Sequence, residues 1–172
     1  KKLWGVPAVC ENLRGNVQTR LKKLLEGQYD AIILAAAGLK RLEILAEADR
    51  ETKVQIPEKN LCFHYLDWDE MIPAGCQGIL AVEGRKGDEV NEAARRICDP
   101  DTLLSFQVER RILRLLNAGC HEPIGVLCTL DGHRMNLSLM EEKEGEVIRR
   151  SVQGDRGDWQ NLVEKLCQER KS

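Results

Sequence analysis

The chain has 172 residues, of which 42% are hydrophobic and 4% aromatic, and its net charge is −2. This length allows one ordinary domain or two small ones, with enough apolar residues to form a core. The nearly balanced charge argues against a general nucleic-acid binder. Because there is neither an apolar run of about 18 residues nor a signal-peptide pattern, we expect a soluble, cytoplasmic protein without a nucleic-acid or membrane partner.

The seven cysteines favour reduced thiols over a disulfide framework. Their number is odd, and none of them forms a C-x-x-C pair,. The spacing of Cys120, Cys128 and His133 matches no familiar set of zinc ligands,. We therefore expect no metal site.

The first part of the chain alternates between strand and helix patterns. Residues 5–10 predict a short strand, and the helix that follows carries Val17, Leu21, Leu24 and Leu25 on one face and closes at Gly27,. Residues 31–35 are continuously apolar, as in a parallel strand covered on both faces, and a second helix runs from residue 36 towards residue 48,. This order predicts a βαβ unit.

Basic residues occupy positions where a helix dipole disfavours them. Arg14 lies at the start of the first predicted helix, and Lys40 and Arg41 lie in the opening turns of the second,. Helix starts that follow parallel strands face the same sheet edge, and Arg20 can reach that region, so the pattern indicates an anionic ligand held by guanidinium groups. A solvated basic face explains the same residues equally well.

The middle of the chain is less regular. An irregular connection with a strand at 61–66 leads to the turn 73–78, where Gln77 either hydrogen-bonds a ligand or simply belongs to a tight turn,. A strand is expected at 79–83. Asp88 then caps a helix whose apolar residues should face inward, namely Val90, Ala93, Ala94 and Ile97. Asp99-Pro100 marks a domain boundary,.

The last part predicts a small α+β unit. A long amphipathic helix runs from residue 100 to 118, with Gly119 as its left-handed stop and Cys120 directly after it,. On spacing alone, Cys120 is better explained as one free thiol among seven than as a covalent attachment point. Three hairpin-connected strands at 124–130, 134–140 and 146–152 precede a final helix,.

Several motifs, in order along nearly the whole chain, resemble the porphobilinogen deaminase (hydroxymethylbilane synthase) family. They are Leu13-Arg14-Gly15-Asn16-Val17 with Thr19-Arg20-Leu21, Tyr29-Asp30-Ala31-Ile32-Ile33-Leu34-Ala35 with Ala37-Gly38-Leu39-Lys40-Arg41-Leu42, Pro73-Ala74 with Gln77-Gly78, Glu83 with Arg85, Glu109-Arg110, and Gly119-Cys120 with Pro123-Ile124-Gly125. The family has glycine where this chain has Cys76, and the connection from 42 to 73 is long for the family.

The resemblance implies a transferase of tetrapyrrole (haem) biosynthesis. Such an enzyme condenses four porphobilinogen molecules into hydroxymethylbilane with release of ammonia. By resemblance, Cys120 carries the dipyrromethane cofactor through a thioether, and Arg14 and Arg20 bind cofactor carboxylates. Arg14, Arg20, Arg41 and Gln77 would bind the substrate and the growing oligopyrroles.

The resemblance also implies an α/β fold class and three segments. Residues 1–77 would form a partial second domain, a βαβ unit of the periplasmic-binding-protein type. Residues 78–98 would correspond to the segment in which the chain of family members runs back into the first domain. Residues 99–172 would form the cofactor-attachment domain, a small α+β unit with a three-stranded antiparallel sheet.

We expect the chain to be a truncated, C-terminal portion of the enzyme. Most of the first domain, which in the family supplies the catalytic aspartate, and the start of the second would be missing. The chain alone is then expected to contain no catalytic residue, to be inactive and to lack the attached cofactor, with the missing N-terminal domain as its partner. Residues 78–98 would pack differently, swap between chains or support a homodimer. The alternative is a non-catalytic small-anion-binding or assembly module derived from that enzyme.

Overall fold

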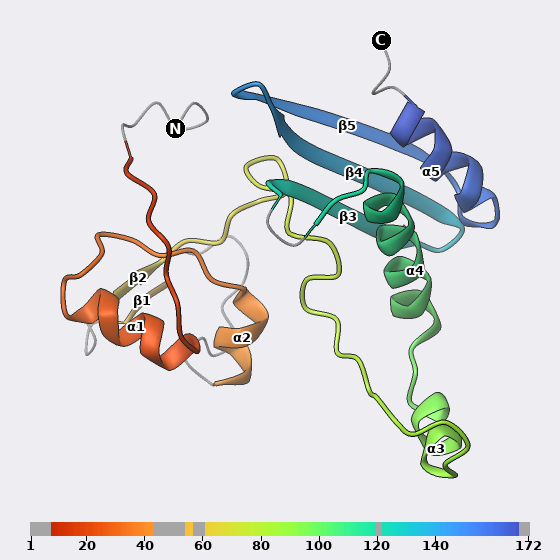
Figure 1. The fold of residues 1–172 in the computed structure, drawn as a ribbon, viewed down its shortest axis with the longest axis horizontal. Coiled ribbons are helices and arrows are strands. Elements are labelled where there is room, and N and C mark those ends of the chain that lie inside the picture. The colour runs from red at the N-terminus through yellow and green to blue at the C-terminus, as the bar shows by residue number, and fades with distance from the viewer. Residues whose placement is uncertain (1–7, 43–53, 57–60, 120–121, 169–172) are drawn as a thin grey trace. The chain divides into compact units, whose positions relative to one another are not determined.

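A computed structural model describes residues 8–42, 54–56, 61–119 and 122–168 (Figure 1). The chain divides into two units, residues 1–70 and 71–172. Each unit has its own cluster of buried apolar side chains.

The first unit contains two short helices and one strand pair. Helix α1 spans Val17–Leu25 and helix α2 spans Ala36–Arg41, and strands β1 (Val54–Ile56) and β2 (Leu61–Phe63) pair antiparallel. Helix α1 begins where the side chain of Asn16 accepts the Thr19 N–H at 2.8 Å, which satisfies one of the unpaired N–H groups of the first turn,. The helix ends before Gly27, as expected, because Gly27 adopts a φ of 72°,.

The predicted parallel strand at 31–35 does not form in the described structure. Ile32 and Leu34 pack on the small core around Leu21, Leu39 and Leu61, whereas Ile33 is 58% exposed. This segment is therefore covered on one side only, and no described strand pairs with it. Because a strand persists only where its backbone groups have partners, the βαβ arrangement is not confirmed.

Two further strand predictions were wrong for the same reason. Residues 8–10 and 79–83 carry no strand in the described structure. In the second of these segments Leu80 is 72% exposed and Val82 is 66% exposed. Residues 5–7 of the first predicted strand, and residues 43–48 of the second predicted helix, lie outside the described residues.

The second unit is built on a three-stranded antiparallel sheet, as predicted. Strands β3 (Ile124–Asp131), β4 (Arg134–Lys143) and β5 (Glu146–Asp155) lie in the order β3-β4-β5. The turns between them have glycine at positive φ, 56° at Gly132 and 80° at Gly145,. Met135, Leu137 and Leu139 of β4 alternate with more exposed residues and are fully buried, which confirms the expected alternation,.

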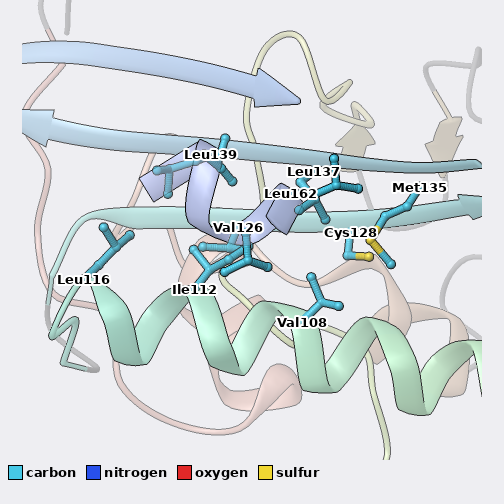
Figure 2. Close-up of a cluster of buried hydrophobic side chains, with 11 residues drawn as sticks. Val108, Ile112, Leu116, Val126, Cys128, Met135, Leu137, Leu139 and Leu162 are labelled. Carbon is cyan, nitrogen blue, oxygen red and sulfur yellow. The ribbon is translucent and has the colours of Figure 1, made fainter. Parts of the chain in front are cut away.

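Two helices cover one face of this sheet (Figure 1). Helix α4 spans Pro100–Leu115, and its N-cap Asp99 accepts the Thr102 N–H at 2.7 Å,. Helix α5 spans Trp159–Gln168 and follows a 3₁₀ turn at Arg156–Asp158. Figure 2 shows side chains of α4 directed towards those of β3 and β4, and Leu162 of α5 joins the same cluster. This cluster is the core of the unit.

The helix predicted after Asp88 forms as α3, Val90–Arg96, but its apolar residues do not face inward. Val90 is 61% exposed and Ile97 is 76% exposed, and no residue of α3 is buried. The periodicity was therefore sufficient to predict the helix but not its packing.

Helix α4 ends earlier than Gly119. Asn117, not Gly119, adopts the left-handed conformation, with a φ of 53°. The Asn117 N–H donates to Arg114 O at 3.1 Å and the Ala118 N–H donates to Leu113 O at 2.9 Å, which is the hydrogen-bond pattern of a Schellman motif,. The prediction of Gly119 was wrong because asparagine also tolerates this conformation.

Replacement of Asn117 tests this helix end. We expect Asn117→Ala to lower the free energy of unfolding by about 1 kcal/mol, because a β-carbon without the asparagine amide is unfavourable at this φ. Asn117→Gly, the matched control, should change it by less than about 0.5 kcal/mol. Urea denaturation followed by circular dichroism measures both. Equal losses in the two variants would contradict the assignment.

Candidate functional site

Two basic side chains, those of Arg20 and Lys23, donate to the backbone of Gly15 and Arg14 just before α1. The Nε–H of Arg20 donates to Gly15 O at 2.7 Å, and Nζ of Lys23 donates to Arg14 O at 3.3 Å. Gly15 has a φ of 121°, and a β-carbon there would lie 2.8 Å from Cγ2 of Thr19. The chain thus turns tightly into the helix, and only glycine allows this close approach.

This arrangement concentrates positive charge at a helix N-terminus. Arg14 is exposed and Arg20 is half-buried, and the hydrogen bond of Arg20 to Gly15 uses its Nε–H. A helix N-terminus already carries a partial positive charge, so cations there are unfavourable unless an anion binds. Guanidinium groups form paired, charge-assisted hydrogen bonds with carboxylates. The start of α1 is therefore suited to a carboxylate ligand.

Arg41 occupies a different electrostatic position from the one predicted. Helix α2 ends at Arg41, with Leu42 as its C-cap, so Lys40 and Arg41 lie in the last turn and not in the opening turns. There the dipole favours cations, and the charge-gradient argument does not apply to them. A β-carbon on Gly38 would lie 3.4 Å from Cγ2 of Val17, so α2 packs near the start of α1. No described contact joins Arg41 to Arg14 or Arg20.

Cys120, the predicted attachment point, lies outside the described residues, as does His121. The residues on either side of this pair are described. The Glu122 N–H donates to Gly119 O at 3.3 Å, so the two ends of the segment lie close together between α4 and β3.

Gln77 belongs to the second unit, in the turn that precedes residues 79–89. Its N–H donates to Ala74 O at 3.1 Å, and the residue is exposed. It lines a cavity of about 300 Å³ together with Thr102, Ser105 and Glu109 of α4 and residues of β3. The structure thus places Gln77 beside α4, while the predicted arginines belong to the first unit.

Glu109 is the residue of this region that the pattern of the sequence did not indicate. Its side chain is 5% exposed, and its carboxylate accepts the Cys76 N–H at Oε2 (2.5 Å) and the Cys128 N–H at Oε1 (2.8 Å). Two signals were available, its position three residues before Ile112 on the inward side of α4 and its place in the family-like motif Glu109-Arg110,. Charged residues are rarely buried unless paired or hydrogen-bonded, and here two N–H groups supply the hydrogen bonds.

Burial controls the ionisation of the groups around Glu109. Burial raises the pKa of the Glu109 carboxyl above its usual value, although the Cys76 and Cys128 N–H groups act in the opposite direction,. Burial, with the nearby Glu109 carboxylate, raises the pKa of the Cys76 thiol. Burial also raises the pKa of the Cys128 thiol to about 11. Neither thiol therefore has the character of a reactive thiolate.

These observations describe a protein of mixed helices and strands, with a three-stranded antiparallel sheet and basic side chains at the start of α1. A family model described as "Porphobilinogen deaminase, dipyromethane cofactor binding domain" matches residues 6–93. This match covers half of the chain, and the chain belongs to the porphobilinogen deaminase family.

Curated relatives agree with this assignment. The porphobilinogen deaminase of Roseiflexus castenholzii is 38% identical over 160 residues, which cover 92% of this chain and 48% of that protein. Those of Clostridium acetobutylicum and Ruminiclostridium josui are 34% and 36% identical and cover 91% and 93% of the chain and 49% and 50% of their own length. The chain thus spans about half the length of the curated relatives it matches.

The matches include every predicted site residue. Arg14, Arg20, Arg41 and Gln77 lie within the family-model match at 6–93, and Cys120 lies beyond it. The match to the Roseiflexus castenholzii protein covers 92% of the chain, so its span extends past position 120. The roles of these residues stay predictions. In the part of the chain that the structure describes, no helix is both long and apolar enough to cross a membrane.

The raised pKa of Cys128 makes its reactivity testable. With a pKa of about 11, only about one Cys128 thiol in a thousand is ionised at pH 8, and the side chain is 6% exposed,. We expect iodoacetamide to label the exposed Cys10, Cys62 and Cys98 well before Cys128. Peptide mass spectrometry over time measures this order. The chain unfolded in guanidinium chloride is the control, and Cys128 labelling in the folded chain at the rate of Cys98 would contradict the burial.

Proposed function

We propose that this chain acts as part of a porphobilinogen deaminase in tetrapyrrole biosynthesis. The complete enzyme would condense four porphobilinogen molecules into hydroxymethylbilane, with release of ammonia, on a dipyrromethane primer. The observation that carries this proposal is the bond from Arg20 to Gly15 O, next to the exposed Arg14 at the start of α1, inside the match to a dipyrromethane-binding family. A pyrrole with acetate and propionate groups supplies the carboxylates that such a site favours.

The residues around α1 fit this ligand. Arg14 is exposed to solvent, and Arg20 is held at the same loop by its bond to Gly15 O. Both would bind carboxylates of the cofactor and of the growing oligopyrrole. Arg41 and Gln77 would contribute to substrate binding, and the Cys120 sulfur would hold the cofactor through a thioether. When bound, the cofactor would supply the pyrrole carbon to which the first substrate molecule is joined.

The chain alone would bind but not polymerise. In the family, an aspartate stabilises the positive charge that develops on the pyrrole during each condensation, and no motif in this sequence matches the one that carries it. Loss of such electrostatic stabilisation costs orders of magnitude in rate. The alternative is a non-catalytic module that binds small anions, because exposed guanidinium groups at a helix start also attract phosphate and citrate.

Calorimetry distinguishes these functions. We expect porphobilinogen to bind more tightly than phosphate or citrate, and Arg14→Ala and Arg20→Ala each to weaken its binding about tenfold, since each removes a charge-assisted hydrogen bond. Lys22→Ala is the matched control, because it removes an equal charge from an exposed residue of the same helix that pairs with Glu26. Equal affinity for all three anions would favour the anion-binding module, and unchanged binding in both arginine variants would exclude this site.

Intact-protein mass spectrometry tests attachment and turnover. We expect no dipyrromethane adduct on Cys120 and no tetrapyrrole after incubation of the chain with porphobilinogen, because the first domain that we expect to be missing is also needed for assembly. Cys120→Ser should give the same spectrum apart from the substitution. An adduct that disappears in Cys120→Ser, or steady formation of tetrapyrrole, would contradict the proposed inactivity.

A further inference from the structure

One carboxylate joins three segments of the second unit. Glu109, on α4, accepts the N–H groups of Cys76 and Cys128, which lie 33 positions before it and 19 positions after it. The Val126 N–H donates to Pro73 O at 2.9 Å, so the same turn is also bonded directly to β3. A β-carbon on Gly75 would lie 2.8 Å from Cδ1 of Leu113, and a β-carbon on Gly125 would overlap the Ile72 carbonyl. Residues 72–77 are therefore packed closely on α4 and β3.

The backbone at Cys76 depends on this packing. Cys76 adopts a φ of 64°, a left-handed conformation that is unfavourable for a residue with a β-carbon,. The hydrogen bond from its N–H to Oε2 of Glu109 favours this conformation over the alternatives. The next residue is Gln77, so the conformation at Cys76 sets the direction in which the Gln77 side chain leaves the turn. Gln77 and Glu109 line the same cavity.

We propose that Glu109 is a positioning residue, which holds the turn at Cys76 so that Gln77 is oriented to bind the substrate. This inference rests on the proposed function, because it takes the role of Gln77 from there. Glu109 would act on the substrate only through Gln77 and would not touch it. Its shared bond to Cys128 also fixes the turn relative to β3, the strand that begins just after the segment containing Cys120.

The two N–H groups make the carboxylate specifically necessary. Each oxygen of Glu109 accepts one N–H, whereas the amide of a glutamine offers one accepting oxygen and an NH₂ group that cannot accept,. Glu109→Gln thus keeps the size of the side chain but leaves one N–H without an acceptor. Glu109→Asp keeps the charge but shortens the side chain by one methylene, so it serves as a second variant if Glu109→Gln fails to fold.

Amide hydrogen exchange on the full chain tests whether Glu109 holds the turn. We expect Glu109→Gln to speed exchange of peptides that contain residues 74–78 by about tenfold, while peptides from α5 exchange as in the wild type. Glu164→Gln is the matched control, since it makes the same chemical change at an exposed residue of α5. Unchanged exchange at 74–78 in a folded Glu109 variant would overturn the inference.

A double-mutant cycle tests whether the positioning acts through Gln77. We expect Glu109→Gln and Gln77→Ala each to weaken porphobilinogen binding by a similar factor, about three- to tenfold, and the double variant to be no weaker than Gln77→Ala alone. Losses that multiply would show that Glu109 acts independently of Gln77 and would overturn the inference. If the wild-type chain binds no porphobilinogen, the proposed function fails instead, and the exchange experiment alone decides whether Glu109 holds the turn.

Discussion

The second unit depends on the shared carboxylate of Glu109. Taking a carboxylate out of water is unfavourable, and the raised pKa of Glu109 shows that burial outweighs the two hydrogen bonds it accepts,. The structure retains this group because the two N–H groups it satisfies belong to segments far apart in the sequence. An apolar side chain could fill the space but would leave both N–H groups without acceptors. The main effect of the carboxylate is therefore to fix the turn at residues 72–77, α4 and β3 relative to one another. Its contribution to net stability is smaller.

The features that depend on local interactions were predicted well from the sequence. The two hairpins of β3, β4 and β5, the alternation along β4 and the start of α4 at Asp99-Pro100 each depend on residues a few positions apart. Predictions that required a distant partner were less successful. Residues 31–35 have the composition of a buried parallel strand, yet composition does not provide the neighbouring strand that this structure requires,. The burial of Glu109 was missed because it depends on Cys76 and Cys128, which are distant in sequence.

The candidate site shows the same difference between features that depend on local spacing and features that depend on distant contacts. The sequence predicts that Arg14 and Arg20 lie near the start of α1, and in the structure Arg20 is held there by its bond to Gly15 O. Arg41 lies in a helix, as predicted, but that helix ends at Arg41 instead of continuing. The helix dipole therefore favours a cation at this position, where the sequence had predicted the opposite. Gln77 was placed in a turn correctly, whereas its neighbours on α4 became known only from the packing of the second unit. Local spacing therefore indicated the helix or turn to which each residue belongs, and the tertiary contacts determined its surroundings.

The exposed stretch between residues 79 and 89 has a consequence for handling the protein. It carries neither helix nor strand, and Leu80 and Val82 are open to solvent, so a protease can reach its backbone,. A single cut there would separate the turn containing Gln77 from α4 along the chain. The bond from the Cys76 N–H to Glu109, together with the bond from the Val126 N–H to Pro73 O, would still join the two pieces. A nicked preparation would thus show two bands on a denaturing gel while eluting as one species under native conditions.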